Sequence, residues 1–397
     1  MKFNTVKLGE YLYIKGRIGW KGLKKKEYLE KSDFRIINGE SLTENGIDWN
    51  KAGFISKERY DESPEIMLQP EDILISTDGT IGKIGYVKAL DMPTTVASGI
   101  FVIRNLKPEI INTRFIYHFF CSQYFKNFIT MRTEGSVIPH LYQKDFVDLD
   151  FPLPDLSVQN KIVGILDVIC EKIDLNKGMN ENLEQHISSF YEHICENKSW
   201  DACELEKLIE VRDGTHDSPK PQTDGYLLVT SKHLLPYGVD RSTPNRIAEK
   251  DFKKINERSL VEQGDVLMSM IGTIGLISFV TDQTIDYAIK NVALFKTSKT
   301  PELAYYFLNF LKSKKTQQYI EMCLAGSTQK YISLGELRKM PIPNPDYVTL
   351  KHFNEIVKPM YQMIILNSQE NITFSMLRNS LLVKLISGEL DVSAIDI

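Results

Sequence analysis

The sequence predicts a mixed α/β (α+β) protein with an internal duplication. We expect two similar globular domains, separated by two long antiparallel helices that form a coiled-coil-like spacer and related by a pseudo-twofold axis. First, DILISTDGTIGKIGYV at 72–87 is repeated as DVLMSMIGTIGLISFV at 265–280. Second, short β-branched and aromatic runs typical of strands surround both copies. Third, a heptad-like apolar ladder follows each copy.

The repeat extends well beyond the shared GTIG. GSVIPHLYQKDFVDLDFPLP at 135–154 aligns without a gap with GSTQKYISLGELRKMPIPNP at 326–345. A repeat of this length is the signature of duplicated structural units, here of roughly 200 residues each. The predicted segments are a globular domain at 1–154, a central helix at 155–199, a second globular domain at 200–345 and a C-terminal helix at 346–397.

Each globular domain should combine strands with one helix. Runs such as DILIS, IGYV and GIFVI in the first copy, and GYLLVT, DVLMSM and NVALF in the second, are punctuated by Gly, Asn, Asp and Pro. That pattern predicts strands and turns. RFIYHFFCSQYFKNFITM and ELAYYFLNFLKSKKTQQYIEMCL each predict one helical stretch after the strands.

The long helices should pack through a seam whose residues recur at alternating steps of four and three. Each helix of about 40 residues would be on the order of 60 Å long. Pro359 interrupts the second ladder and predicts a kink or a restart. The ladders are Ile162, Leu166, Ile169, Ile173, Asn176, Asn180, Leu183, Ile187, Phe190 and Ile194, then Phe353, Val357, Met360, Ile364, Asn367, Asn371, Phe374, Arg378, Leu381 and Leu385.

Two asparagines lie midway along each ladder, Asn176 and Asn180 in the first, Asn367 and Asn371 in the second. In an antiparallel pair the midpoints meet, so the four amides should stack in one layer. Such a layer lowers stability but fixes register, because a slipped pairing leaves amides unpaired. The alternative is four solvated side chains at a frayed middle. Their matched positions favour the layer.

Composition and charge narrow the class of protein. The 397 residues are 42% hydrophobic and 25% charged, and contain neither a long apolar run nor a secretory leader. The five cysteines form no CxxC pair, which favours reduced thiols and a cytoplasmic location without a membrane. A net charge of −4 argues mildly against a protein that is covered by nucleic acid. It is compatible with a local basic face, because the distribution of charge matters more than its sum. The lysine-rich loop at 16–26 is either such a face or a solvated loop.

The chain resembles the specificity subunit of bacterial type I restriction-modification systems over essentially its whole length. The resemblance rests on the paired GTIG, the GS turns before Pro-x-Pro, and the helical segments LSVQNKIVGILDVICEKID and MLRNSLLVKLISGEL. It implies that each globular domain is a target recognition domain reading half of a split double-stranded DNA site. It also implies that the helices set the gap and dock two modification (methyltransferase) subunits, and that restriction subunits join for cleavage.

Differences between the copies indicate where bases would be read. Asp78 and Lys83 around the first GTIG become Ile271 and Leu276 around the second. Gln329 suits adenine, and Lys330 suits guanine or phosphate; for each, the alternative is a surface side chain that touches nothing. The candidate DNA-contacting residues are Arg17, Lys21, Lys24, Lys25, Thr80, Lys83, Ser136, His140, Tyr142, His216, Lys220, Lys232, Thr273, Ser327, Thr328, Gln329, Lys330 and Tyr331.

No catalytic, metal-binding or cofactor-binding motif is expected. GTIGK lacks the spacing and the Ser or Thr of a phosphate-binding loop. NPDY at 344–347 departs from the NPPY of amino-methyltransferases, and the histidines form no HxH, HxxH or HxxxH pair. The leading hypothesis is therefore a non-catalytic DNA-recognition subunit. A helical scaffold that binds only proteins, insensitive to DNA competitor, and an enzyme with an unrecognised site, active in isolation, are the alternatives.

Overall fold

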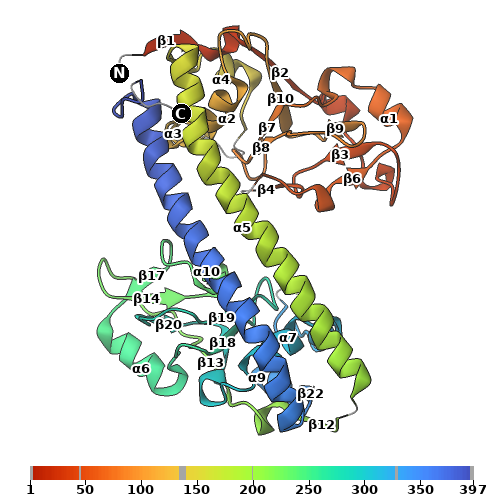
Figure 1. Cartoon of the computed structure of the whole chain (residues 1–397), viewed down its shortest axis with the longest axis vertical. Coiled ribbons are helices and arrows are strands. Elements are labelled where there is room, and N and C mark those ends of the chain that lie inside the picture. The colour runs from red at the N-terminus through yellow and green to blue at the C-terminus, as the bar shows by residue number, and fades with distance from the viewer. Residues whose placement is uncertain (1–2, 44–45, 134–139, 199, 327–329, 394–397) are drawn as a thin grey trace. The chain divides into compact units, whose positions relative to one another are not determined.

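The computed structural model describes residues 3–43, 46–133, 140–198, 200–326 and 330–393, and the chain divides into two compact units (Figure 1). The first unit comprises 1–173 and 372–397, and the second comprises 174–371. These units cut across the two helical segments expected from the sequence. The reason is that part of each long helix packs into the hydrophobic core of each globular domain.

The first unit is built around a four-stranded antiparallel sheet of order β2-β10-β7-β8. A three-stranded sheet, β6-β3-β9, pairs β3 with β9 in parallel, and β1-β11 and β4-β5 form short ribbons. Its elements are β1 (Asn4–Lys7), β2 (Leu12–Gly16), β3 (Arg35–Ile37), β4 (Leu42–Thr43), β5 (Gly46–Ile47), β6 (Gly53–Phe54), α1 (Lys57–Asp61), β7 (Ile73–Ser76), β8 (Ile84–Tyr86), β9 (Thr94–Val96), β10 (Ile100–Asn105), α2 (Thr113–Cys121), α3 (Gln123–Thr133), α4 (Gln143–Val147) and β11 (Asp150–Leu153).

The second unit repeats this topology element by element. Its sheets are β13-β21-β18-β19, β17-β14-β20 with β14 and β20 parallel, and the ribbons β12-β22 and β15-β16. Its elements are β12 (Ala202–Glu204), β13 (Val211–Asp213), β14 (Tyr226–Val229), β15 (Leu234–Leu235), β16 (Gly238–Val239), β17 (Asn245–Ile247), α6 (Glu249–Ser259), β18 (Val266–Ser269), β19 (Ile277–Phe279), β20 (Tyr287–Ile289), β21 (Val292–Phe295), α7 (Ala304–Lys312), α8 (Lys314–Met322), α9 (Leu334–Lys339) and β22 (Pro341–Pro343). The predicted mixed α/β fold with an internal duplication is therefore correct.

Each helical stretch expected after the strands is in fact two helices. The chain leaves the helix at Ser122 in the first unit and at Ser313 in the second, where the backbone is extended. The Ser313 hydroxyl then accepts a hydrogen bond from the backbone N–H of Thr316 at 3.3 Å. A serine at this position caps the following helix, which explains the break.

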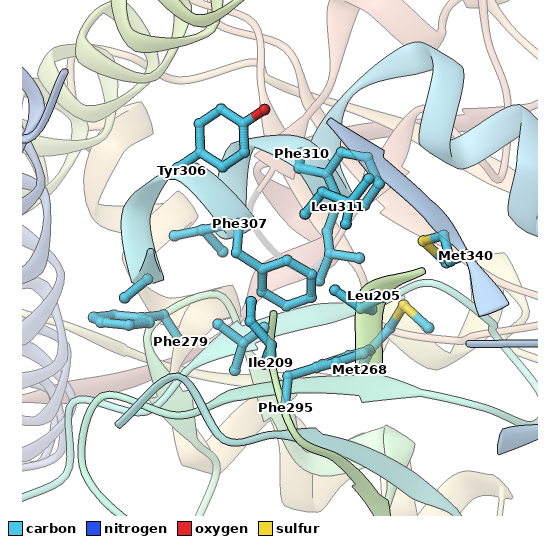
Figure 2. Packing of buried hydrophobic residues seen from close by; sticks show 14 of the residues in the cluster. Leu205, Ile209, Met268, Phe279, Phe295, Tyr306, Phe307, Phe310, Leu311 and Met340 are labelled. Carbon is cyan, nitrogen blue, oxygen red and sulfur yellow. The ribbon is translucent and has the colours of Figure 1, made fainter. Parts of the chain in front are cut away.

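The core of the second unit lies between its four-stranded sheet and α7. Figure 2 shows the ring of Phe307, from α7, directed toward Phe295 of β21 and Ile209. The rings of Phe307 and Phe295 meet edge-on, with centroids 4.9 Å apart. Both residues are fully buried. This aromatic contact and the surrounding aliphatic residues hold the sheet whose loops are described below.

The long helices are α5 (Leu156–Asn197) and α10 (Tyr347–Ile386). In the first unit, Ile162 and Leu166 of α5 share a core with Leu385 of α10, and in the second unit Ile187 of α5 shares one with Phe353 of α10. The expected restart at Pro359 is wrong, because α10 continues through it. Pro359 is exposed and lies off the seam, so the carbonyl that loses its partner is on the solvent side of the helix.

The four seam asparagines all lie in the second unit and face one another across the helix pair. Asn176 Nδ2 donates to Asn371 Oδ1 at 3.1 Å, and Asn367 Nδ2 donates to Asn180 Oδ1 at 2.9 Å. Asn176 is 2% exposed and Asn367 is 6% exposed. The amides thus form a paired layer in which Asn176 and Asn367 are buried and Asn180 and Asn371 are half-buried; that this layer fixes register remains a prediction.

The layer can be tested with a double-mutant cycle. Asn367→Leu alone removes the donor to Asn180 and should lower the free energy of unfolding by about 1–3 kcal/mol. Combining it with Asn180→Leu should restore much of that loss, because neither member of this pair is then left without its partner. Urea denaturation provides the measurement, with Asn182→Leu on the exposed face of α5 as the control. Additive losses in the double variant would contradict the pairing.

Candidate nucleic-acid interface

In each unit, loops gather at one edge of the four-stranded sheet, which we call the loop edge. In the second unit the loop edge comprises 214–218, 270–276, 290–291 and 330–332. Backbone hydrogen bonds join these segments: Asn291 N–H donates to Thr215 O at 3.1 Å, Met270 N–H to Asn291 O at 3.4 Å and Ile332 N–H to Met270 O at 3.1 Å.

The first unit has the matching loop edge, which comprises 77–83, 98–99 and 140–142. Thr77 N–H donates to Gly99 O at 2.8 Å, and Leu141 N–H donates to Thr77 O at 3.0 Å. These bonds correspond one for one to bonds of the second unit. The two loop edges therefore share these parts of the backbone frame while presenting different side chains.

The GTIG sequence forms the hairpin loop at each edge, between β7 and β8 and between β18 and β19. A serine at the end of the first strand closes this loop. Ser269 Oγ donates to Thr273 O at 2.5 Å and accepts from Leu276 N–H at 2.8 Å, and Ser76 does the same in the first unit. The loop needs left-handed backbone, which favours glycine, at Gly79 (φ 61°), Gly82 (φ 85°), Gly272 (φ 80°) and Gly275 (φ 81°).

The lysine-rich loop of the first unit divides into buried and exposed cations. Arg17 is 6% exposed, and its Nε donates to Val96 O at 3.0 Å. Burial lowers the pKa of Arg17, and its position argues against the expected phosphate contact. Lys21 Nζ donates to Glu62 O at 2.6 Å, which anchors the loop. Lys24 and Lys25 remain exposed.

The other candidates of the first unit line its loop edge. Thr80 is exposed at the tip of the hairpin loop, whereas Lys83 Nζ donates to Gly39 O at 3.1 Å. His140 and Tyr142 pack against each other with ring centroids 4.8 Å apart, and Tyr142 is 55% exposed. Ser136 lies outside the described residues.

In the second unit, the structure brings the hairpin loop and the segment after the GS turn together. Tyr331 forms β-bridges with Ile271 and Ala325, which places it beside the loop that carries exposed Thr273. Lys220, Lys232 and Lys330 are exposed. Ser327, Thr328 and Gln329 lie outside the described residues.

The exposed side chain of His216 has a polar partner at each ring nitrogen. Its Nδ1 lies 2.8 Å from Asn291 Oδ1, and its Nε2 lies 3.0 Å from Asp213 Oδ2. An open groove of about 450 Å³ runs beside it, between residues 215–219 and α6, and includes Lys254 and Arg258 among its lining. The groove therefore carries charged groups of both signs next to the loop edge, since Asp217 and Asp251 also line it.

Asn291 was not singled out from the sequence. It has φ 54°, and its counterpart in the first unit is Gly99, with φ 80°. An Asn opposite a Gly in the aligned repeats was the available signal, since both residues tolerate left-handed backbone. Among the described residues, no group of three or more His, Cys, Asp or Glu side chains is placed to hold a metal ion.

The repeated α/β domain with a matching loop edge, combined with an antiparallel helix pair, defines a two-domain recognition subunit. The model of the type I restriction modification DNA specificity domain matches residues 2–185 and 197–373. The chain belongs to this family, and it is a specificity subunit of the type I restriction-modification class with two copies of the domain.

Known relatives agree with this assignment. The MjaIX type I restriction enzyme specificity subunit of Methanocaldococcus jannaschii is 24% identical over 340 residues, covering 78% of this chain and 76% of the relative. The EcoKI specificity subunit of Escherichia coli is 24% identical over 398 residues, covering 91% and 84%. The crystal structure of the S subunit from M. genitalium has the same fold, with a TM-score of 0.54, 14% identity and coverage of 99% and 97%. Within the described ranges, no helix combines the length and apolar character needed to cross a membrane.

Proposed function

We propose that this chain reads a bipartite double-stranded DNA site for a type I restriction-modification complex, with one half-site per loop edge. The observation that carries the proposal is a shared backbone frame that presents different side chains. Asp78 is replaced by Ile271, Lys83 by Leu276 and Gly99 by Asn291 at equivalent positions. Each base pair presents a distinct set of hydrogen-bonding groups in the major groove. Two similar backbone frames that carry different side chains would therefore select two different half-sites.

Phosphate contacts would come from exposed cations around the loop edges. In the first unit, the candidates Lys24 and Lys25 are exposed together with Lys26. Their loop passes close to the loop edge at Gly22. A Cβ at this glycine would lie 3.2 Å from Ser98 Oγ. Such contacts position a protein on DNA without reading sequence.

The long helices would set the gap between half-sites and dock two methyltransferase subunits, with restriction subunits completing the complex. Exposed apolar residues on the helices support this role, since large exposed apolar patches on soluble proteins mark interaction sites. Leu175 is 69% exposed and Leu366 is 58% exposed, at matching positions of the repeat. Matching patches suit two copies of one partner.

The chain itself would be non-catalytic and cytoplasmic, and would need no cofactor. Methyl transfer and cleavage would belong to the partner subunits. The exposed helix faces also fit a scaffold that binds proteins alone. Competition separates the two, because DNA that carries the recognised site should compete for the complex only in the recognition role.

Methylation mapping tests the proposal. The chain is co-expressed with its methyltransferase subunit, and methylated adenines are located by long-read sequencing. We expect one two-part motif with a fixed gap, present only when this chain is present. Methylation that persists without the chain, or no methylation from a complex that assembles, would contradict the recognition role.

The exposed lysines give a quantitative prediction. Replacing Lys24, Lys25 and Lys26 by Ala should weaken DNA binding by the assembled complex at all sequences. It should also reduce the slope of log affinity against log salt by up to about 3, since each phosphate contact contributes roughly 0.9. Fluorescence anisotropy at several salt concentrations measures the slope. Lys107→Ala, exposed after β10 at the opposite edge of the sheet, is the control. Equal slopes for wild type and triple variant would exclude these lysines.

A further inference from the structure

We propose that Asn291 is a base-reading residue of the second unit and that His216 is the positioning residue that orients its amide. The proposal rests on the DNA-recognition function above and names one position at which the two half-sites must differ. It arises from the backbone of Asn291, the side chains behind it and the different occupant of the same place in the first unit.

The backbone at Asn291 would suit glycine better. Asn291 has φ 54° in the turn between β20 and β21, and the equivalent residue of the first unit is glycine, Gly99. The turn makes the same hydrogen bond in both units, to Met270 N–H and to Thr77 N–H respectively. Asparagine enters left-handed backbone more readily than most residues, but at a cost that glycine avoids. The turn itself therefore does not require the Asn291 side chain.

A row of polar side chains contacts the amide of Asn291 on its oxygen side. His216 Nδ1 is 2.8 Å from Asn291 Oδ1, and His216 Nε2 is 3.0 Å from Asp213 Oδ2. One ring nitrogen of His216 therefore faces the Asp213 carboxylate, and the other faces the amide oxygen of Asn291. Arg258 Nη2 donates to Asp213 Oδ1 at 2.9 Å and holds that carboxylate in place.

The row leaves the amide nitrogen facing outward. With Oδ1 turned to His216, Asn291 presents Nδ2, and none of the described residues is recorded as accepting a hydrogen bond from it. Asn291 itself is half-buried at the loop edge, between the hairpin loop and residues 214–218. A fixed outward donor in this place suits a base that offers an acceptor in the major groove. Guanine, adenine N7 and thymine O4 meet that condition.

The first unit offers the opposite chemistry at the same place. A Cβ added to Gly99 would lie only 2.0 Å from Asp78 Oδ1, so the carboxylate of Asp78 fills the space that the Asn291 side chain takes in the second unit. A carboxylate accepts hydrogen bonds, as cytosine N4 requires. The two loop edges therefore present a donor and an acceptor at equivalent points.

Two substitutions at Asn291 test the donor role in the assembled complex. Methylation is measured on DNA duplexes in which one half-site at a time is randomised. Asn291→Asp keeps the acceptor facing His216 but replaces the outward donor by an acceptor. It should shift the preference at one base pair toward cytosine or adenine N6, by about tenfold or more. Asn291→Gly should lose the preference at that base pair alone.

Controls separate base reading from folding. Glu71→Gly is the matched control, because Glu71 is the other described non-glycine residue with positive φ, at 72°, and its counterpart Gly264 is glycine. Glu71 precedes β7, at the opposite edge of the sheet, so this variant should keep the wild-type motif. Both glycine variants relieve the backbone and should fold.

The positioning role of His216 has its own readout. Replacing His216 by Ala removes the ring nitrogen that faces Asn291 Oδ1, so the amide is no longer held with Nδ2 outward. The preference at the base pair should then weaken in His216→Ala, whereas adding His216→Ala to Asn291→Gly should change nothing further there.

The outcomes are distinct. Unchanged motifs in both Asn291 variants would overturn the inference and leave the recognition function intact. A change in both half-sites, or a loss of methylation with no change of preference, would also overturn it. Failure of the recognition function would instead appear in the wild type, as methylation without any motif.

Discussion

The apolar seam of the two long helices is the constraint on which the rest of the structure depends. In each unit, residues from α5 and α10 complete the core of the globular domain: Leu166 and Leu385 in the first, and Tyr191 and Val357 in the second. The four-stranded sheet packs on that same core through the helix that follows it. The loop edge of each unit is therefore held on a rigid frame that reaches the helices, as a recognition surface requires.

The side-chain contacts between each globular domain and the long helices differ between the two units, although the backbone topology is the same. In the first unit, Asp167 of α5 accepts hydrogen bonds from His118, at 2.7 Å, and from Arg114. Burial alone would raise the pKa of Asp167, but these two partners lower it to about 2. At the equivalent place in the second unit the contact is uncharged: Tyr305 stacks on Tyr361 with ring centroids 4.8 Å apart. Both solutions satisfy buried polar groups, so either holds the same geometry.

The large-scale features could be predicted from the sequence because they depend on periodicity. The heptad ladder and the long aligned repeat each involve many residues, so single exceptions such as Arg378 do not hide them. Details that depend on one hydrogen bond were missed. Ser122 and Ser313 divide what read as single helices, because capping outweighs a continuous apolar pattern.

Candidate site residues were harder to predict because composition does not report burial. Arg17 belongs to a basic run, yet its side chain is buried and donates a hydrogen bond to Val96 O. Lys24 and Lys25 of the same run are exposed. Asn291 was missed because its significance lies in a backbone angle and in a histidine distant in sequence. Neither can be read from residue types alone. Aligning the two halves position by position gave the better signal, since shared residues such as Ser76 and Ser269 form the frame.

The central claim is that each loop edge reads its own half-site within a common frame. The most direct test replaces residues 200–345 by a second copy of residues 1–154 and maps the adenine methylation directed by the resulting complex. The account predicts a motif with the same half-site twice, on opposite strands, in place of two different halves. A methylated motif that keeps the wild-type asymmetric halves would contradict it.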